Sequence, residues 1–151
     1  MTRDTAPIGY ARYSNEFYRA AMAADDAVGE DTGFEIAAPV PVLYLIGHSI
    51  ELALKSFLLF RGVSEGELRK LYGHDLQAAY DDAVKNGLHE IYAPDESEIE
   101  VLALLNALYR SKELNYIATG YKEFPVFGPL QTLSKNLMVG VSKAVGWRVK
   151  L

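Results

Sequence analysis

The segment Pro41–Gly62, PVLYLIGHSIELALKSFLLFRG, is apolar on nearly every side when it is drawn as a helix. Such a helix has to be surrounded by other elements of the fold. His48, Glu51 and Lys55 interrupt the apolar pattern, and their offsets of three and four residues place them on one face. Because unpaired buried charge is costly, this polar row predicts a structural brace between helices or, as the alternative, a binding site.

Helical periodicity covers most of the chain, and capping patterns indicate where helices begin. Ser64 and Glu67, like Asp95 and Glu98, have the spacing of a capping box, and Asp75 is placed to cap the segment that follows it. The sequence therefore predicts an all-α, antiparallel helical bundle with a four-helix core and one or two short helices. The expected helices are Thr5–Val28, Pro41–Gly62, Ser64–Tyr72, Leu76–Asn86, one from Asp95 to about Leu114–Ile117, and one from Gly128 to about Val145.

The composition limits the possible classes of protein. The chain has 151 residues, a formal net charge of −5 and no cysteine. This length predicts one domain over 1–151, with the bundle at about 6–145, a connection at 29–40 and a tail at 146–151. The lack of cysteine excludes disulfides and thiolate metal sites. The acidic balance argues against a general nucleic-acid or membrane surface, and the ionisable residues within Pro41–Gly62 argue against a membrane span, so we expect a cytoplasmic protein.

No metal or cofactor site is expected from the sequence. His48, His74 and His89 lie in separate predicted elements, and no two histidines have the helical spacing of a zinc site. There is no glycine-rich phosphate loop. His89 is interpreted as an exposed loop residue. His74 precedes the capping residue Asp75, and a turn explains its neighbours while leaving His74 itself without a role.

A second group of polar residues follows the apolar stripe of the fifth predicted helix. Asn106 and Arg110 are four residues apart, so they share a face that needs a partner within the bundle, at an interface or in a ligand. Asn115 and Tyr116 come shortly afterwards. In a regular helix Asn115 lies on a different face from Arg110, and the two converge only if the helix kinks or ends between them.

Three of these stretches together resemble the HEPN (higher eukaryotes and prokaryotes nucleotide-binding) domain. They are IGHSIELALKSFLLFRG, then KLYGHDLQAAYDDA, then ALYRSKELNY, in this order on an all-α pattern. The resemblance covers about residues 6–145. It implies an antiparallel bundle with a four-helix core that forms a homodimer. It also implies a nucleotide or RNA ligand and, as a possible protein partner, a nucleotidyltransferase.

The resemblance also implies a site. Active HEPN ribonucleases carry an arginine followed four to six residues later by a histidine, without a metal. Arg110 matches the arginine, whereas Asn115 and Tyr116 stand where the histidine is expected. We therefore expect a binding module without catalysis, with Arg110, Asn115, Tyr116, Asn106 and His74 as candidate ligand contacts. The alternatives are a ribonuclease that uses a histidine from elsewhere, and a structural or antitoxin-type interaction protein.

Overall fold

Capping groups and glycines set the ends of the helices in the computed structural model, which describes residues 6–29, 38–71, 74–110 and 124–151. Within these ranges all regular structure is helical, so the predicted all-α bundle is confirmed. The elements are α1 (Pro7–Val28), α2 (Val40–Phe60), α3 (Glu65–Leu71), α4 (Leu76–Lys85), the 3-10 helix η2 (Leu88–Glu90), α5 (Glu96–Arg110) and α6 (Phe127–Val145).

The predicted caps are present. Asp95 and Glu98 form both arms of a capping box, because the Glu98 N–H donates to Asp95 Oδ1 at 2.9 Å and the Asp95 N–H donates to Glu98 Oε2 at 2.8 Å. Ser64 Oγ accepts the Glu67 N–H at 3.2 Å. Gly62 follows the end of α2 with a φ of 99°, a left-handed conformation that glycine adopts without strain.

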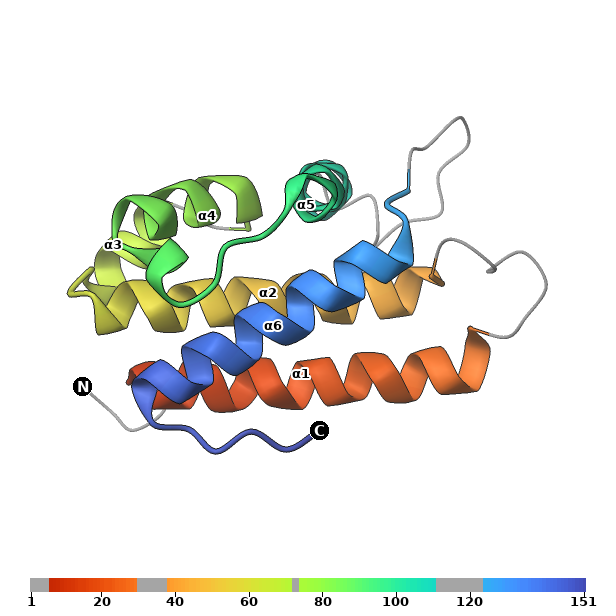
Figure 1. Ribbon diagram of the computed structural model, residues 1–151, viewed down its shortest axis with the longest axis horizontal. Coiled ribbons are helices and arrows are strands. Elements are labelled where there is room, and N and C mark those ends of the chain that lie inside the picture. The colour runs from red at the N-terminus through yellow and green to blue at the C-terminus, as the bar shows by residue number, and fades with distance from the viewer. Residues whose placement is uncertain (1–5, 30–37, 72–73, 111–123) are drawn as a thin grey trace.

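Helices α1 and α2 form an antiparallel pair (Figure 1). Two serines of α2 fix its register against α1: Ser49 Oγ donates to the Ser14 carbonyl at 2.8 Å, and Ser56 Oγ donates to the Pro7 carbonyl at 2.6 Å. Helix α6 lies across both helices. Helices α3 and α4 lie along the C-terminal half of α2, and α5 is viewed nearly end-on in Figure 1, so it crosses the α1–α2 pair steeply.

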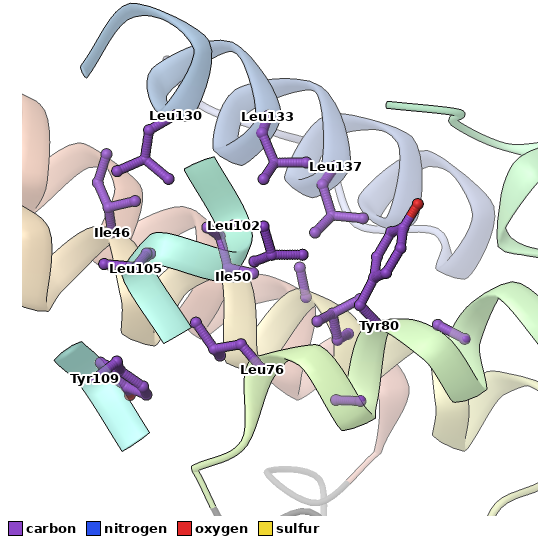
Figure 2. Packing of buried hydrophobic residues seen from close by; sticks show 14 of the residues in the cluster. Ile46, Ile50, Leu76, Tyr80, Leu102, Leu105, Tyr109, Leu130, Leu133 and Leu137 are labelled. Atoms are coloured by element: carbon purple, nitrogen blue, oxygen red, sulfur yellow. The ribbon is translucent and has the colours of Figure 1, made fainter. Parts of the chain in front are cut away.

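The core is built around α2, as its apolar sequence predicts. Ile46 and Ile50 of α2 meet leucines of α5 and α6 in the close-up of the core (Figure 2). By length and hydropathy α2 would also pass as a membrane span, but most of its apolar window is buried inside the fold. Its apolar surface is therefore occupied by packing within the chain. The leucines that surround it are Leu102, Leu105, Leu130, Leu133 and Leu137.

The C-terminal residues after α6 run back along α1 (Figure 1). The side chain of Asn15, which is buried on α1, accepts the Lys150 N–H at 2.9 Å and donates to the Lys150 carbonyl at 2.7 Å. The Trp147 indole N–H also points to Asn15 Oδ1, at 3.4 Å. The segment that the sequence predicts as a tail is therefore attached to the bundle by one asparagine.

Gly47 permits a close approach between α2 and α5. A Cβ atom added at Gly47 would lie 2.7 Å from Cδ1 of Tyr109, a buried residue near the end of α5. Because real Cβ contacts are longer than this, any larger residue would displace the tyrosine ring. Gly47 thus fixes how near α5 comes to the polar face of α2.

We predict that Gly47→Ala lowers the free energy of unfolding by about 1–3 kcal/mol, because overpacking costs more than the helix propensity gained by alanine. Urea unfolding at equilibrium measures this. The control is Gly66→Ala in α3, where the nearest atom, Ser64 Oγ, lies 4.0 Å from the added Cβ. The control should be neutral or stabilising by up to about 1 kcal/mol. Equal effects of the two substitutions would contradict the close approach.

Candidate functional site

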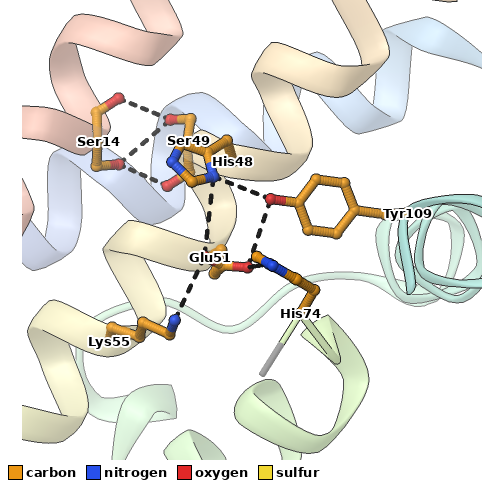
Figure 3. Close-up of polar contacts among 7 residues, drawn as sticks. All are labelled: Ser14, His48, Ser49, Glu51, Lys55, His74 and Tyr109. Atoms are coloured by element: carbon orange, nitrogen blue, oxygen red, sulfur yellow. Dashed lines mark hydrogen bonds and ion pairs between the residues drawn. The ribbon is translucent and has the colours of Figure 1, made fainter. Parts of the chain in front are cut away.

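Glu51 is buried, with an exposed fraction of 4%, and polar groups from three parts of the chain surround its carboxylate (Figure 3). His74 Nδ1 lies 2.8 Å from Oε1, and the Tyr109 hydroxyl donates to the same oxygen at 3.4 Å. On the other oxygen, Lys55 Nζ lies at 3.3 Å and His48 Nδ1 at 3.8 Å. These contacts provide the partners that a buried carboxylate requires.

The local sequence explains how these groups come together. The spacing of His48, Glu51 and Lys55 places them on one face of α2, where His48 and Lys55 both lie beside the Glu51 carboxylate. His74 enters from the turn before α4, because its neighbour Asp75 caps that helix. Tyr109 enters from α5. The brace therefore joins α2, α5 and the start of α4.

His48 and Tyr109 form the inner part of the cluster. The two are linked through His48 Nδ1 and the Tyr109 hydroxyl, 3.0 Å apart, and the edge of the His48 ring packs on Phe17 with the centroids 4.4 Å apart. Burial lowers the pKa of His48 below 6.5, although the negative charge of Glu51 opposes this. Burial, and then the Glu51 charge, raises the pKa of Tyr109. Both side chains are therefore neutral near pH 7, and the hydroxyl stays a donor.

His74 forms the outer part, with 55% of its side chain exposed. Its Nδ1 is paired with the Glu51 carboxylate, which favours the tautomer protonated at Nδ1. Within the described part of the chain Nε2 has no hydrogen-bond partner. A carboxylate behind one ring nitrogen, with the other nitrogen open, is the arrangement that orients a histidine for proton transfer.

A second cluster lies beside the first and centres on Asp75. Its Oδ1 accepts the Ala78 N–H and the Asn106 side-chain amide, each at 3.1 Å. Asn106 also accepts the Leu76 N–H at 2.8 Å. Arg110 Nε lies 3.6 Å from Asp75 Oδ2. Asn106 and Arg110 thus share a face, as predicted, and that face is directed at the N-terminus of α4.

Asp75 keeps its charge and leaves Arg110 accessible. Partial burial acts to raise the pKa of Asp75, but the hydrogen bonds from Ala78 and Asn106 and the charge of Arg110 outweigh it, so the pKa lies below 3.8. The Arg110 side chain is 68% exposed. An ion pair this exposed contributes little to stability, and it leaves most of the guanidinium open to solvent.

The two clusters meet because His74 and Asp75 are consecutive. Three of the predicted ligand contacts, His74, Asn106 and Arg110, are thereby brought together, and the row on α2 joins them through Glu51. Asn115 and Tyr116 lie outside the described residues. The sequence interpretation missed Tyr109, whose place at the edge of an apolar stripe suggested only packing.

Other predicted features can be located as well. His89 is exposed, as predicted, but lies in η2, where its Nε2 is 3.2 Å from the Tyr80 hydroxyl. Among the described residues there is no group of three side chains that could hold a metal ion. A surface cavity lies elsewhere, between Ile8 and residues 146–150.

Comparison with known protein families, with curated proteins and with solved structures finds no match for this chain. What the chain does must therefore be inferred from the chemistry of the site. Two exposed groups define that chemistry. The Arg110 guanidinium is suited to bind a phosphate, and the His74 imidazole is suited to exchange a proton.

We predict that Glu51→Gln lowers the free energy of unfolding by about 3 kcal/mol, because the mostly buried Lys55 ammonium loses its counter-charge. Chemical denaturation at pH 7.5 measures this. The control is Glu16→Gln, which removes an exposed ion pair with Arg12 and should change stability by no more than about 0.5 kcal/mol. A Glu51 variant as stable as the control would contradict the role of the brace.

Proposed function

We propose that this chain is a HEPN-like helical module that binds a phosphate-bearing ligand, a nucleotide or an RNA end, at Arg110. The observation that carries the proposal is that the exposed Arg110, at the end of α5, is paired with Asp75, the residue directly after the exposed His74. With the resemblance to HEPN domains come two further parts of the proposal, a homodimer and a nucleotidyltransferase-type protein partner.

The orientation of the Arg110 guanidinium supports binding of an anion. Asp75 holds the Arg110 guanidinium through Nε, which leaves the two terminal nitrogens of the guanidinium outside that contact. A phosphate that reaches these nitrogens forms charge-assisted, bidentate hydrogen bonds. Asp75 then orients the arginine, and its negative charge weakens the binding of anions that contact this guanidinium alone. This arrangement favours a ligand with more than one point of contact.

The Glu51–His74 pair favours a second candidate function, metal-independent cleavage of RNA. In this reading His74 takes the place of the histidine that is missing after Arg110. Its Nε2 would remove the proton from a ribose 2′-hydroxyl, while Arg110 holds the phosphate that the 2′-oxygen attacks. The 5′-oxygen would leave with a proton from water, which yields a cyclic phosphate. Glu51 would stabilise the imidazolium that forms.

A purely structural or antitoxin-type role is the remaining reading. A structural role predicts a buried Glu51–Lys55 pair that is joined to His74, and the contacts agree with this. However, a brace alone does not require half of the imidazole, or most of the arginine, to face solvent. The exposure of His74 and Arg110 leaves both side chains accessible to a ligand.

We predict that the protein binds fluorescent nucleotides or short RNAs and that Arg110→Ala weakens this binding by about 10- to 100-fold, the equivalent of a lost charge-assisted hydrogen bond. Fluorescence anisotropy at several salt concentrations measures this. Arg12→Ala on α1, an exposed arginine also paired with a carboxylate, is the matched control and should bind as the wild type does. A lack of binding at high micromolar protein, or an unchanged Arg110→Ala variant, would reject the proposal in favour of a scaffold.

For the second candidate, we predict cleavage of a mixed RNA pool in EDTA that is lost in His74→Gln while RNA binding persists. Glutamine keeps a polar side chain but cannot accept a proton near neutral pH. Denaturing gels and detection of cyclic phosphate ends measure the outcome. The ribonuclease reading fails if the wild type does not cleave RNA in EDTA, or if His74→Gln cleaves as fast as the wild type.

A further inference from the structure

An exposed aromatic ring lies beside the site and has no part in the two polar clusters. Tyr44 is on α2, four residues before His48 and seven before Glu51, so it extends the same helix face towards the N-terminus of α2. Its side chain is one of the exposed large residues of the fold, at 40%. The polar face of α2 therefore ends in an aromatic surface that is open to solvent.

The ring of Tyr44 packs against the ring of Tyr109. Its centroid lies 6.0 Å from that of Tyr109, with 49° between the ring planes. The Tyr109 ring in turn meets the His74 ring edge-on, with the centroids 5.8 Å apart. Because the Tyr109 hydroxyl is bonded to Glu51, this row of three rings is fixed to the brace. Arg110 is the next residue after the middle ring.

A single exposed aromatic residue is common on protein surfaces and needs no explanation by itself. Tyr44 differs from an exposed ring such as Phe60, which also lies beside an arginine, because a row of rings connects Tyr44 through Tyr109 to His74. Aromatic rings beside cationic groups are how proteins hold unpaired nucleobases together with their phosphates, and each stacked base strengthens binding by about 5- to 150-fold.

We propose that Tyr44 is a stacking platform for an unpaired nucleobase whose phosphate is bound by Arg110. The site then takes single-stranded RNA or a mononucleotide and discriminates against duplex RNA, in which both faces of each internal base are already stacked. This inference rests on the proposed phosphate-binding function and adds the base as a second point of contact. Stacking involves no hydrogen-bond readout of the base, so we expect little preference for base identity.

The test uses three labelled probes with the full-length protein: a single-stranded RNA hexamer, the same hexamer without bases, and the corresponding duplex. The wild type should bind the single strand at least tenfold more tightly than the other two. Tyr44→Leu keeps an apolar contact with Tyr109 but removes the π face. It should lose about tenfold in affinity for the single strand and nothing for the abasic strand, whereas Tyr44→Phe should bind like the wild type.

Phe60→Leu is the matched control, because Phe60 is a 47% exposed ring at the opposite end of α2. It should leave all three affinities unchanged. The inference is overturned if Tyr44→Leu binds the single strand like the wild type, loses affinity equally for the abasic strand, or if the duplex binds as tightly as the single strand. Failure of the phosphate-binding function itself looks different, because Arg110→Ala would then match the wild type on every probe.

Discussion

The structure depends on a negative charge placed in the middle of its most apolar helix. Glu51 lies on α2, which is surrounded by α1, α4, α5 and α6, and a carboxylate there is tolerated only if other groups supply hydrogen bonds and positive charge. Lys55 on the same helix supplies the charge, and His74 and Tyr109 supply hydrogen bonds from other segments. Satisfying one buried group therefore constrains how α5 and the turn before α4 pack against α2.

This constraint has a consequence for function. His74 and Asp75 are consecutive residues. His74 contacts the Glu51 carboxylate, whereas Asp75 caps α4 and contacts Asn106 and Arg110. The position of Arg110 is thereby coupled to the same brace that orients His74. A site built on side chains held by capping and core contacts is fixed before any ligand arrives, which lowers the entropic cost of binding.

Much of the fold follows from local sequence. The side-chain cap at Ser64, the capping box at Asp95 and the glycine after α2 are confirmed, because each depends on residues a few positions apart. The members of the polar row on α2 lie side by side for the same reason, since helical spacing alone brings them together. Local signals of this kind did not reveal η2 or the attachment of the C-terminal segment to Asn15.

The candidate site was less predictable, because its decisive contacts join distant residues. Glu51 and His74 are 23 positions apart, and Tyr109 reaches Glu51 only because Gly47 lets α5 approach. Asp75 was predicted as a cap, but its contact with Arg110 depends on the angle at which α5 meets α4. No periodicity encodes such angles. Arg110 itself was singled out because it shares a helix face with Asn106, whereas its expected role came from the resemblance, and the assignment to HEPN domains stays a proposal.

The central claim is that the Glu51 carboxylate orients His74. Its most direct test is the tautomer of His74, read from the side-chain ¹⁵N chemical shifts by two-dimensional NMR at pH 8. We predict that Nδ1 carries the proton and that Nε2 is unprotonated, and that Glu51→Ala shifts the population towards the Nε2-protonated form. A wild-type His74 protonated at Nε2, or a tautomer that the Glu51→Ala variant leaves unchanged, would contradict the account.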